Sequence, residues 1–331
     1  MSDFTLWLPI LDDPPVYCIT SGWLQRSGFE LSLRMAAGRP FHLLVSASWD
    51  VASIVPDLAA FHMRVTSMHP GVDVTFMPQT AADAALLRDV GLKALHVHRN
   101  ALTDDAAFHP DHSAPKRFAA VHNANLAPFK RHALAWSVRR IALITYDVMA
   151  DRDTSELDGY EDIAWSNRDA AGYPHWIEQD EVARIVNQAH CGLMVSELEG
   201  GNGASTEYLF CGVPLITTLS RGGRHAMYDM ASVTIVPPER RAVAAAVEAA
   251  ARRSVDAEEI RARVMARALP HRRRLIDWLS AVSGRDLYSE AGTRLWLPRF
   301  RHRLRQVVDR QTGLVPALPP GLAHDARETA A

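Results

Sequence analysis

The hydrophobic positions of this chain form short apolar runs that alternate with segments of helical periodicity. In the first part, strands are expected at Val16–Thr20, His42–Ser46, Asp73–Met77 and Ala94–Val97, with helices at Gln25–Ala37, Val51–Phe61 and Ala82–Val90. Crossovers of this length join parallel strands, and right-handed crossovers build a doubly wound layer. The pattern therefore predicts an α/β fold with parallel sheets.

A polar, proline-containing segment at Asp104–Lys116 interrupts this alternation, and a second series follows it. In that series we expect strands at Phe118–Asn123, Arg140–Tyr146, Cys191–Ser196, Pro214–Thr218 and Val233–Val236, and helices at Lys130–Val138, Glu178–Gln188, Thr206–Cys211 and Arg240–Arg253. The interruption is typical of a linker between domains. The sequence thus predicts one domain over residues 1–115, a second over 116–290, and a C-terminal helix and frayed tail over 291–331.

Composition agrees with two soluble domains. The length of 331 residues exceeds what one ordinary core organises, and 48% hydrophobic with 22% charged residues is typical of globular proteins. A formal net charge of −2 gives no general attraction to nucleic acid or to anionic membranes. We therefore expect no nucleic-acid partner.

The cysteines and the N-terminus bear on the compartment. Cys18, Cys191 and Cys211 form an odd set without C-x-x-C spacing, which favours a reducing compartment and argues against disulfides and a zinc site. The N-terminal residues show neither a basic region nor an apolar region of a secretory signal. No apolar run approaches the roughly 20 residues that span a bilayer. We expect a cytoplasmic protein without a bound metal.

The richest segment for chemistry follows one buried strand. Gly192–Val195 leads to Glu199, a glycine-rich turn at Gly200–Gly203 and a helix that contains Glu207. Ligands of open α/β sheets bind beyond the carboxyl ends of the strands. Glycines there let backbone N–H groups approach a phosphate, and the helix N-terminus adds a favourable dipole. Carboxylates beside such a turn are suited to accept hydrogen bonds from sugar hydroxyls.

This turn has two alternative interpretations. A dinucleotide site would need a third small residue where Thr206 stands, and an acidic residue at the end of the next strand, Leu215–Thr218, which has none. Hydride chemistry is therefore excluded. The remaining structural alternative is an ordinary strand-to-helix turn with a solvated acidic flank.

The order of elements from Glu199 onward carries a family resemblance. The segment Glu199–Glu207, followed by Gly212-Val-Pro214 and then Gly222-Gly-Arg224, resembles the C-terminal domain of family 4 glycosyltransferases. That family's pattern is Glu, seven residues, Glu, then Gly-x-Pro and a second glycine turn. The resemblance runs from Phe118 to Val236. It implies a GT-B fold, in which two Rossmann-like domains face each other across a cleft. It also implies a nucleotide-diphosphate sugar donor, retention of configuration, and no obligatory metal or cofactor.

The resemblance assigns roles to individual residues. Glu207 would bind the donor's ribose hydroxyls, and Glu199 would contact the transferred sugar. The turn residues Gly201, Asn202, Gly203, Ala204 and Ser205 would border the sugar and the diphosphate, and Trp176 with Ile177 would line the nucleobase.

The diphosphate contacts depart from the family pattern at one position. The family places an Arg and a Lys five residues apart, and the matching residues here are Asn125 and Lys130. An amide can donate to a phosphate oxygen but cannot neutralise a leaving group, so Arg131 is expected to supply the missing charge. The expected catalytic residues are thus Glu199, Lys130 and Arg131. For the two cations, a solvated helix start is the alternative. For the whole chain, the alternative is a catalytically weakened nucleotide-sugar-binding partner or regulatory protein.

Three other segments give weaker evidence of function: the loop with Gly22, the pair His96-x-His98 and the basic run Arg299–Arg305. By resemblance, the loop with Gly22 faces the donor diphosphate and the acceptor, and His98 is a candidate general base or acceptor contact. Because His96-x-His98 has no third ligand in view, core or surface histidines are the favoured interpretation. The basic run Arg299–Arg305 suits either a solvated helix face, an inter-domain brace or a peripheral contact with a membrane. The expected acceptor is a glycan, a lipid-linked sugar or a small molecule.

Overall fold

The computed structural model describes residues 8–20, 40–47, 50–145, 157–168, 170 and 174–287. The chain divides into two compact units, residues 1–102 with 269–331, and residues 103–268. The helix expected at 25–37, the loop with Gly22, and the expected C-terminal helix and tail at 291–331 lie outside the described residues. None of the helices in the described ranges is long and apolar enough to cross a membrane.

The first unit is built on a four-stranded sheet in the order β1-β2-β3-β4. The strands are β1 (Leu8–Asp12), β2 (Pro15–Thr20), β3 (Phe41–Ser46) and β4 (Val72–Met77). β1 pairs antiparallel with β2, and the other pairs are parallel. The strand expected at 94–97 does not form, since Ala94 makes only an isolated bridge with Phe76. Beyond it the chain enters a 3-10 turn, Arg99–Leu102.

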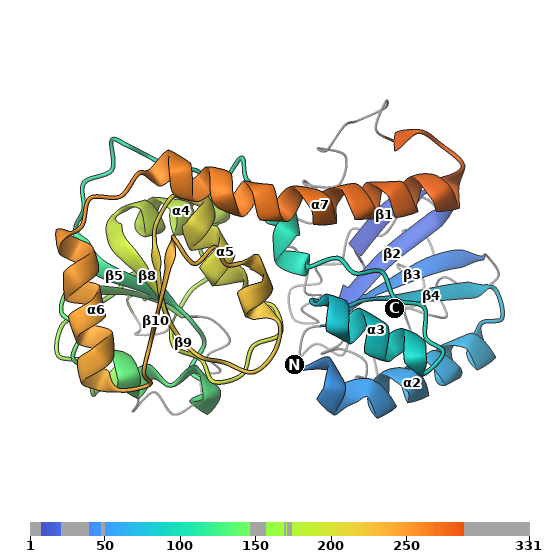
Figure 1. Cartoon of the computed structure of the whole chain (residues 1–331), viewed down its shortest axis with the longest axis horizontal. Helices are drawn as coiled ribbons and strands as arrows, with labels where there is room; N and C mark the ends of the chain where they lie inside the picture. The colour runs from blue at the N-terminus through green and yellow to red at the C-terminus, as the bar shows by residue number, and fades with distance from the viewer. Residues whose placement is uncertain are drawn as a thin grey trace. The chain divides into compact units, whose positions relative to one another are not determined.

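Helices cover both faces of this sheet, as a parallel sheet requires. Leu43 and Val45 face α2 (Val51–Met68), next to which lies α3 (Ala81–Asp89). The intervening Leu44 belongs to the opposite cluster, with Leu275 of α7 (Ala257–Ser283). Figure 1 shows α2 and α3 on one side of the strands and α7 on the other. The period-two alternation of the strand therefore sends successive residues into two separate cores.

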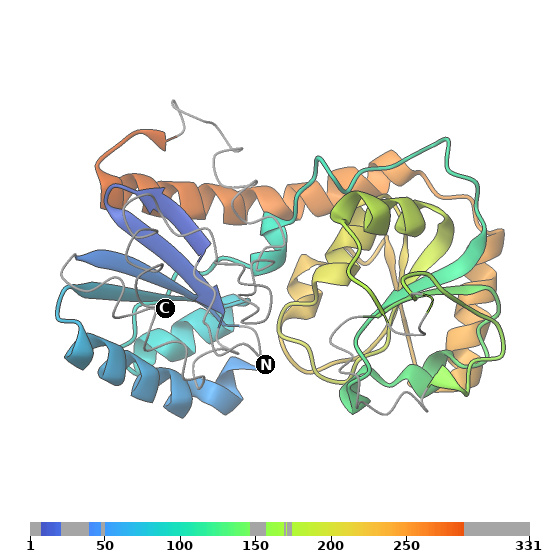
Figure 2. The ribbon, with the colours of Figure 1, turned by 180° about the vertical axis from the view of Figure 1, so that it is seen from behind.

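The second unit contains a six-stranded sheet in the order β10-β9-β8-β5-β6-β7, and all its pairs are parallel. The strands are β5 (Phe118–Asn123), β6 (Ile141–Ile144), β7 (Ile163–Trp165), β8 (Ala189–Met194), β9 (Leu215–Thr218) and β10 (Val233–Val236). The helices are α4 (Gln179–Asn187), α5 (Gly203–Phe210) and α6 (Arg240–Arg252). α6 lies on one side of the sheet, and α4 with α5 on the other (Figures 1 and 2). This is a doubly wound layer, as expected.

One expected helix in the second unit does not form. Residues 130–138 contain two short 3-10 turns, Pro128–Lys130 and His132–Ala135, separated by Arg131. Arg131 has a φ of 53°, in the left-handed region, which cannot continue a right-handed helix. Its side chain donates to the Val195 carbonyl, directly after β8, and to Thr218 of β9. Tertiary contacts therefore override the local helical propensity here.

The division between the units also differs from the expected boundary near residue 115. Residues 103–115 pack on the second unit, because Asn187 bonds the backbone of His109 and Asp111, and Arg261 donates to the carbonyl of Phe108. The long helix α7 was not expected from the sequence, and the division falls within it, beside Pro270. Pro270 lies inside the helix, although proline removes one of the helix's backbone hydrogen bonds.

The packing of α5 on β8 makes a first prediction. A Cβ added to Gly192 would fall 2.0 Å from Cδ2 of Tyr208. We expect Gly192→Ala to lower the free energy of unfolding by about 1–3 kcal/mol, measured by chemical denaturation, because the ring must shift. In a Tyr208→Leu background the same substitution should cost less, because the clashing ring is gone. An equal cost in both backgrounds would contradict this packing.

Candidate functional site

The N-terminus of α5 is fixed by Asn202. The side-chain Oδ1 of Asn202 accepts from the backbone N–H of Ser205 at 2.9 Å, and Ser205 Oγ donates to the Asn202 carbonyl at 3.0 Å. Asparagine is among the residues that best satisfy an otherwise unpaired N–H of a first turn. The helix therefore begins at Gly203, earlier than the expected Thr206. The N-terminus of α5 lies beyond the carboxyl end of β8.

Glu199 is buried in the turn between β8 and α5. Its Oε1 accepts hydrogen bonds from Lys130 Nζ, from Ser196 Oγ at 2.9 Å and from Asn202 Nδ2 at 3.1 Å. Asn202 thus caps the helix with one end of its amide and holds Glu199 with the other. Three donors on one oxygen fix the direction of the carboxylate.

The second glycine turn packs against the backbone of Glu199. The Glu199 N–H donates to the Arg221 carbonyl at 2.9 Å, and Arg221 N–H donates to the Glu197 carbonyl at 2.9 Å. Gly222 follows with a φ of +93°, and a Cβ there would lie 2.2 Å from the Glu199 carbonyl oxygen. Only glycine fits this backbone conformation and this approach.

Lys130 reaches Glu199 from the loop that follows β5. Both side chains are nearly inaccessible, at 5% and 11% exposure, and they form a buried ion pair across 69 positions of sequence. The sequence suggested these residues separately, one for the diphosphate and one for the sugar. In the described chain they are brought together and bind each other.

A chain of buried hydrogen bonds supports the loop that carries Lys130. His132 Nε2 lies 2.8 Å from the Asn125 carbonyl, and its Nδ1 lies 2.9 Å from the Tyr160 hydroxyl. A carbonyl only accepts, so Nε2 carries the proton and Nδ1 accepts from Tyr160. His122 Nδ1, at 3.3 Å from the same hydroxyl, must then be the donor. This assignment takes both histidines as neutral, because burial lowers the pKa of each.

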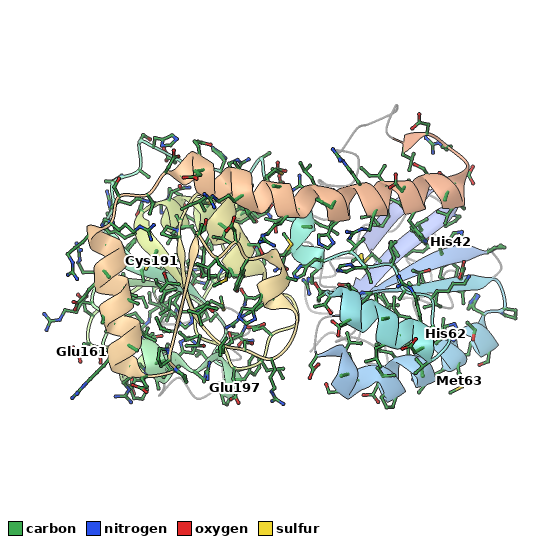
Figure 3. The ribbon with its side chains drawn as sticks, in the orientation of Figure 1. His42, His62, Met63, Glu161, Cys191 and Glu197 are labelled. Atoms are coloured by element: carbon green, nitrogen blue, oxygen red, sulfur yellow. The ribbon has the colours of Figure 1, made fainter. Side chains whose placement is uncertain are left out.

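The expected diphosphate contacts at 125 and 131 are both engaged within the chain. Arg131 Nε donates to the Val195 carbonyl at 2.7 Å, and its Nη2 donates to Thr218 Oγ1 at 2.7 Å. Burial lowers the pKa of Arg131, and Glu197 acts in the opposite direction. Glu197 is exposed at the surface of the second unit (Figure 3). Cys191, by contrast, lies in the interior of that unit. Asn125 Oδ1 accepts from the N–H of Ala127 at 3.2 Å, which closes a local turn.

Arg224, which was not singled out as a site residue, is fully buried directly after the second glycine turn. Its Nη2 donates to Thr217 Oγ1 at 3.0 Å and to the Thr218 carbonyl at 2.6 Å. Among the described residues, its Nε and Nη1 have no hydrogen-bond partner. Burial lowers the pKa of Arg224. The sequence marks this position only by the Gly-Gly pair before it.

The remaining expected donor contacts occupy different surroundings. Glu207 is buried on α5, and its Oε1 would lie 3.6 Å from a Cβ on Gly203, so the carboxylate turns back toward the helix N-terminus. Trp176 is 59% exposed in the segment that precedes α4, beside the partly buried Ile177.

His98 lies in the first unit and is buried. Its Nδ1 accepts from the N–H of Asn100 at 3.2 Å, and its own N–H donates to His271 Nδ1 at 3.2 Å. These bonds agree with the interpretation of a core histidine. Among the described residues, no group of three or more His, Cys, Asp or Glu side chains is placed to hold a metal ion.

Comparison with known proteins identifies the fold. No protein-family model matches the chain, and no curated protein matches it significantly. Solved structures do match. The chain is similar to sucrose-phosphate synthase from Thermosynechococcus elongatus, with 16% identity, a TM-score of 0.54, and coverage of 81% of this chain and 74% of that one. The chain has the fold of the GT-B glycosyltransferases.

Two further matches carry nucleotides in their crystal structures. Anabaena HepE in complex with UDP-glucose gives 12% identity and a TM-score of 0.54, over 80% of this chain and 79% of that chain. The pneumococcal O-GlcNAc transferase GtfA in complex with UDP and GlcNAc gives 14% identity and a TM-score of 0.50, over 78% of this chain and 55% of that chain. At these identities the likeness establishes a shared fold.

The buried ion pair makes a second prediction. Lys130→Met leaves the Glu199 carboxylate buried without the cation that is hydrogen-bonded to it, so the free energy of unfolding should fall by about 3–5 kcal/mol. Adding Glu199→Gln to that variant removes the carboxylate charge that has lost its partner and should recover most of the loss. Denaturation of both single variants and the double variant measures this coupling. Independent, additive losses would show that the pair is not coupled.

The buried histidines make a third prediction. Burial holds the pKa of His122 well below its ordinary value, with His132 and Lys130 lowering it further, and burial also lowers the pKa of His132. Below about pH 6.5 the unfolded chain takes up protons that the folded chain refuses, so the free energy of unfolding falls. We expect a His122→Leu variant to lose less stability than the unmodified chain between pH 7 and pH 5. Parallel pH profiles would contradict the assignment.

Proposed function

We propose that this chain is a retaining, nucleotide-sugar-dependent glycosyltransferase of family 4. The observation that carries the proposal is the buried Glu199 carboxylate, which three donors orient at the N-terminus of α5 beside Lys130. Further support comes from proteins of the same fold, since the HepE structure holds UDP-glucose and the GtfA structure holds UDP and GlcNAc. The donor is a substrate, and the proposal needs neither a metal nor a cofactor.

Each group has a role that its chemistry suits. The N–H groups of the first turn of α5, in residues 201–205 with Asn202 as cap, border the sugar and the diphosphate. Glu207, turned back toward the same helix end, accepts from the ribose hydroxyls. Trp176 and Ile177 offer an exposed aromatic ring and an aliphatic contact for the base.

Donor binding exchanges the partners of the ion pair. Without ligand, Lys130 and Glu199 neutralise each other. When the donor binds, a diphosphate oxygen takes over the Lys130 ammonium, and a sugar hydroxyl donates to Glu199. Each charged group thereby keeps a hydrogen-bond partner in both states, which lowers the cost of separating the pair.

In the proposed reaction the bond between the anomeric carbon and the diphosphate oxygen breaks while the acceptor oxygen bonds to the same face of that carbon. The nucleoside diphosphate leaves with both electrons of the broken bond, and the departing phosphate oxygen takes the acceptor's proton. Lys130 and the α5 N-terminus stabilise the negative charge where it grows. No side chain acts as a nucleophile. The acceptor is sought among glycans, lipid-linked sugars and small molecules.

A second candidate is a nucleotide-sugar-binding partner or regulatory protein with little turnover. Two observations favour it. Position 125 holds a neutral asparagine, and the Arg131 guanidinium is bonded to Val195 and Thr218 inside the chain. This candidate shares the donor site and differs only in rate.

Ligand-induced stabilisation tests the donor class first. Thermal unfolding is measured with UDP, GDP, ADP and TDP, each alone. A ligand at about 100 times its dissociation constant adds roughly 2.7 kcal/mol to the free energy of unfolding, so one base should stand out. No stabilisation by any of the four would overturn both candidates.

Turnover then separates the two candidates and gives a fourth prediction. We expect slow hydrolysis of the matching nucleotide sugar, with faster release of the nucleoside diphosphate when the right acceptor is present. Lys130→Ala should reduce kcat on the order of 10²-fold, because it removes a charge that acts on the leaving group. Rates are compared at a temperature where circular dichroism shows both proteins folded. An unchanged kcat in Lys130→Ala would show that Lys130 has no catalytic role. Donor binding without turnover in the unmodified chain would favour the binding protein.

A further inference from the structure

Arg224 is a buried cation for which the described chain offers no carboxylate in hydrogen-bond contact. Its side chain is inaccessible, and the two acceptors of its Nη2 group, Thr217 Oγ1 and the Thr218 carbonyl, are neutral. The Nε and Nη1 groups are buried without hydrogen-bond partners among the described residues. Burying a charge in this state is costly, and an unsatisfied buried group of this kind calls for an explanation.

The charges around Arg224 leave a positive surplus. The elements packed there contribute Glu199 after β8, Arg131 and Lys130 after β5, and Tyr228 and His225 beside Arg224. Burial raises the pKa of Tyr228 and lowers the pKa of His225, so both stay neutral near pH 7. Glu199 is bonded to Lys130, and Glu197 is exposed to solvent. Glu207 is also buried, on α5, but among the described residues Glu199 is the buried carboxylate that acts on Arg224, and it faces more than one cation.

We propose that Arg224 supplies the positive charge against which the donor's diphosphate binds. Asn125 is neutral and cannot supply that charge, and the Arg131 guanidinium is already hydrogen-bonded to the Val195 carbonyl and to Thr218. The inference rests on the proposed function and names a further positioning residue of the same site. Arg224, which directly follows the second glycine turn, acts through its electrostatic field and without contact with the ligand. A charge in a poorly solvated interior acts over a longer distance than one at the surface.

The expected effect follows from Coulomb's law. At an effective dielectric constant of about 20 and a separation of about 10 Å, one unit charge changes the affinity for a singly charged group on the order of ten-fold. The effect must fall on the charged part of the ligand. A neutral nucleoside that shares the base and ribose contacts should be insensitive to Arg224.

The test compares two ligands and three variants. Arg224→Gln removes the charge but keeps an N–H donor for the Thr218 carbonyl, and Arg224→Lys keeps the charge. Arg241→Gln removes an exposed arginine from α6 and serves as the matched control. Calorimetry measures the dissociation constants of the nucleoside diphosphate selected by the thermal screen and of its nucleoside. We expect Arg224→Gln to lose about ten-fold affinity for the diphosphate and none for the nucleoside, while Arg224→Lys and Arg241→Gln keep the native ratio.

Stability distinguishes this role from a merely structural one. Removing an unbalanced buried charge should leave the thermal midpoint of ligand-free Arg224→Gln unchanged or higher. If the thermal midpoint is lower and both ligands bind more weakly by the same factor, Arg224 has only a structural role between η6 (Arg224–Met227) and β9, and the inference is overturned. An unchanged ratio in Arg224→Gln would also overturn it, while diphosphate binding by the unmodified chain would leave the proposed function standing. Failure of the unmodified chain to bind any nucleoside diphosphate would instead remove the proposed function itself.

Discussion

The buried ion pair between Lys130 and Glu199 is the contact on which the rest of the site depends. Two desolvated charges are stable only when their remaining hydrogen-bonding capacity is met, and Ser196 and Asn202 meet it on the carboxylate. Asn202 also caps α5, so the start of the helix and the direction of the carboxylate are set by one side chain. Gly222 then follows because no Cβ fits against the Glu199 carbonyl. One interaction thus fixes the loops after β5 and β8 and the second glycine turn.

The loop that presents Lys130 is held from behind by polar groups rather than by a helix. His132 binds the Asn125 carbonyl and is itself held by the Tyr160 hydroxyl, and Arg131 donates to Val195, directly after β8, and to Thr218 of β9. Each of these bonds is buried or partly buried, so its loss would leave an unpaired group. A loop held in this way presents its cation in a fixed place, which is the condition for stabilising charge that appears only during a reaction.

Charge, more than shape, relates this arrangement to nucleotide sugars. A carboxylate suits sugar hydroxyls but repels a diphosphate, so a site for both must keep positive charge close to the carboxylate. Lys130 is one such charge and is already paired. The buried Arg224 adds another without a carboxylate of its own, and the first turn of α5 adds its dipole. The neutral residue at 125 therefore does not by itself leave the site without positive charge.

The sequence by itself determined the features that depend on local order. Alternating apolar runs and helical segments predicted parallel α/β layers, since strand and helix periods are properties of neighbouring residues. The order of Glu199, the glycines, Glu207 and the second glycine turn pointed to the GT-B fold that the solved structures share. Tertiary structure alone decided what depends on distant partners. It bent Arg131 into a left-handed turn where a helix was expected, left residues 94–97 with a single bridge, and extended α7 through Pro270. It also paired Lys130 with Glu199 and buried Arg224, because desolvation and charge balance arise only when segments far apart in the chain are packed together.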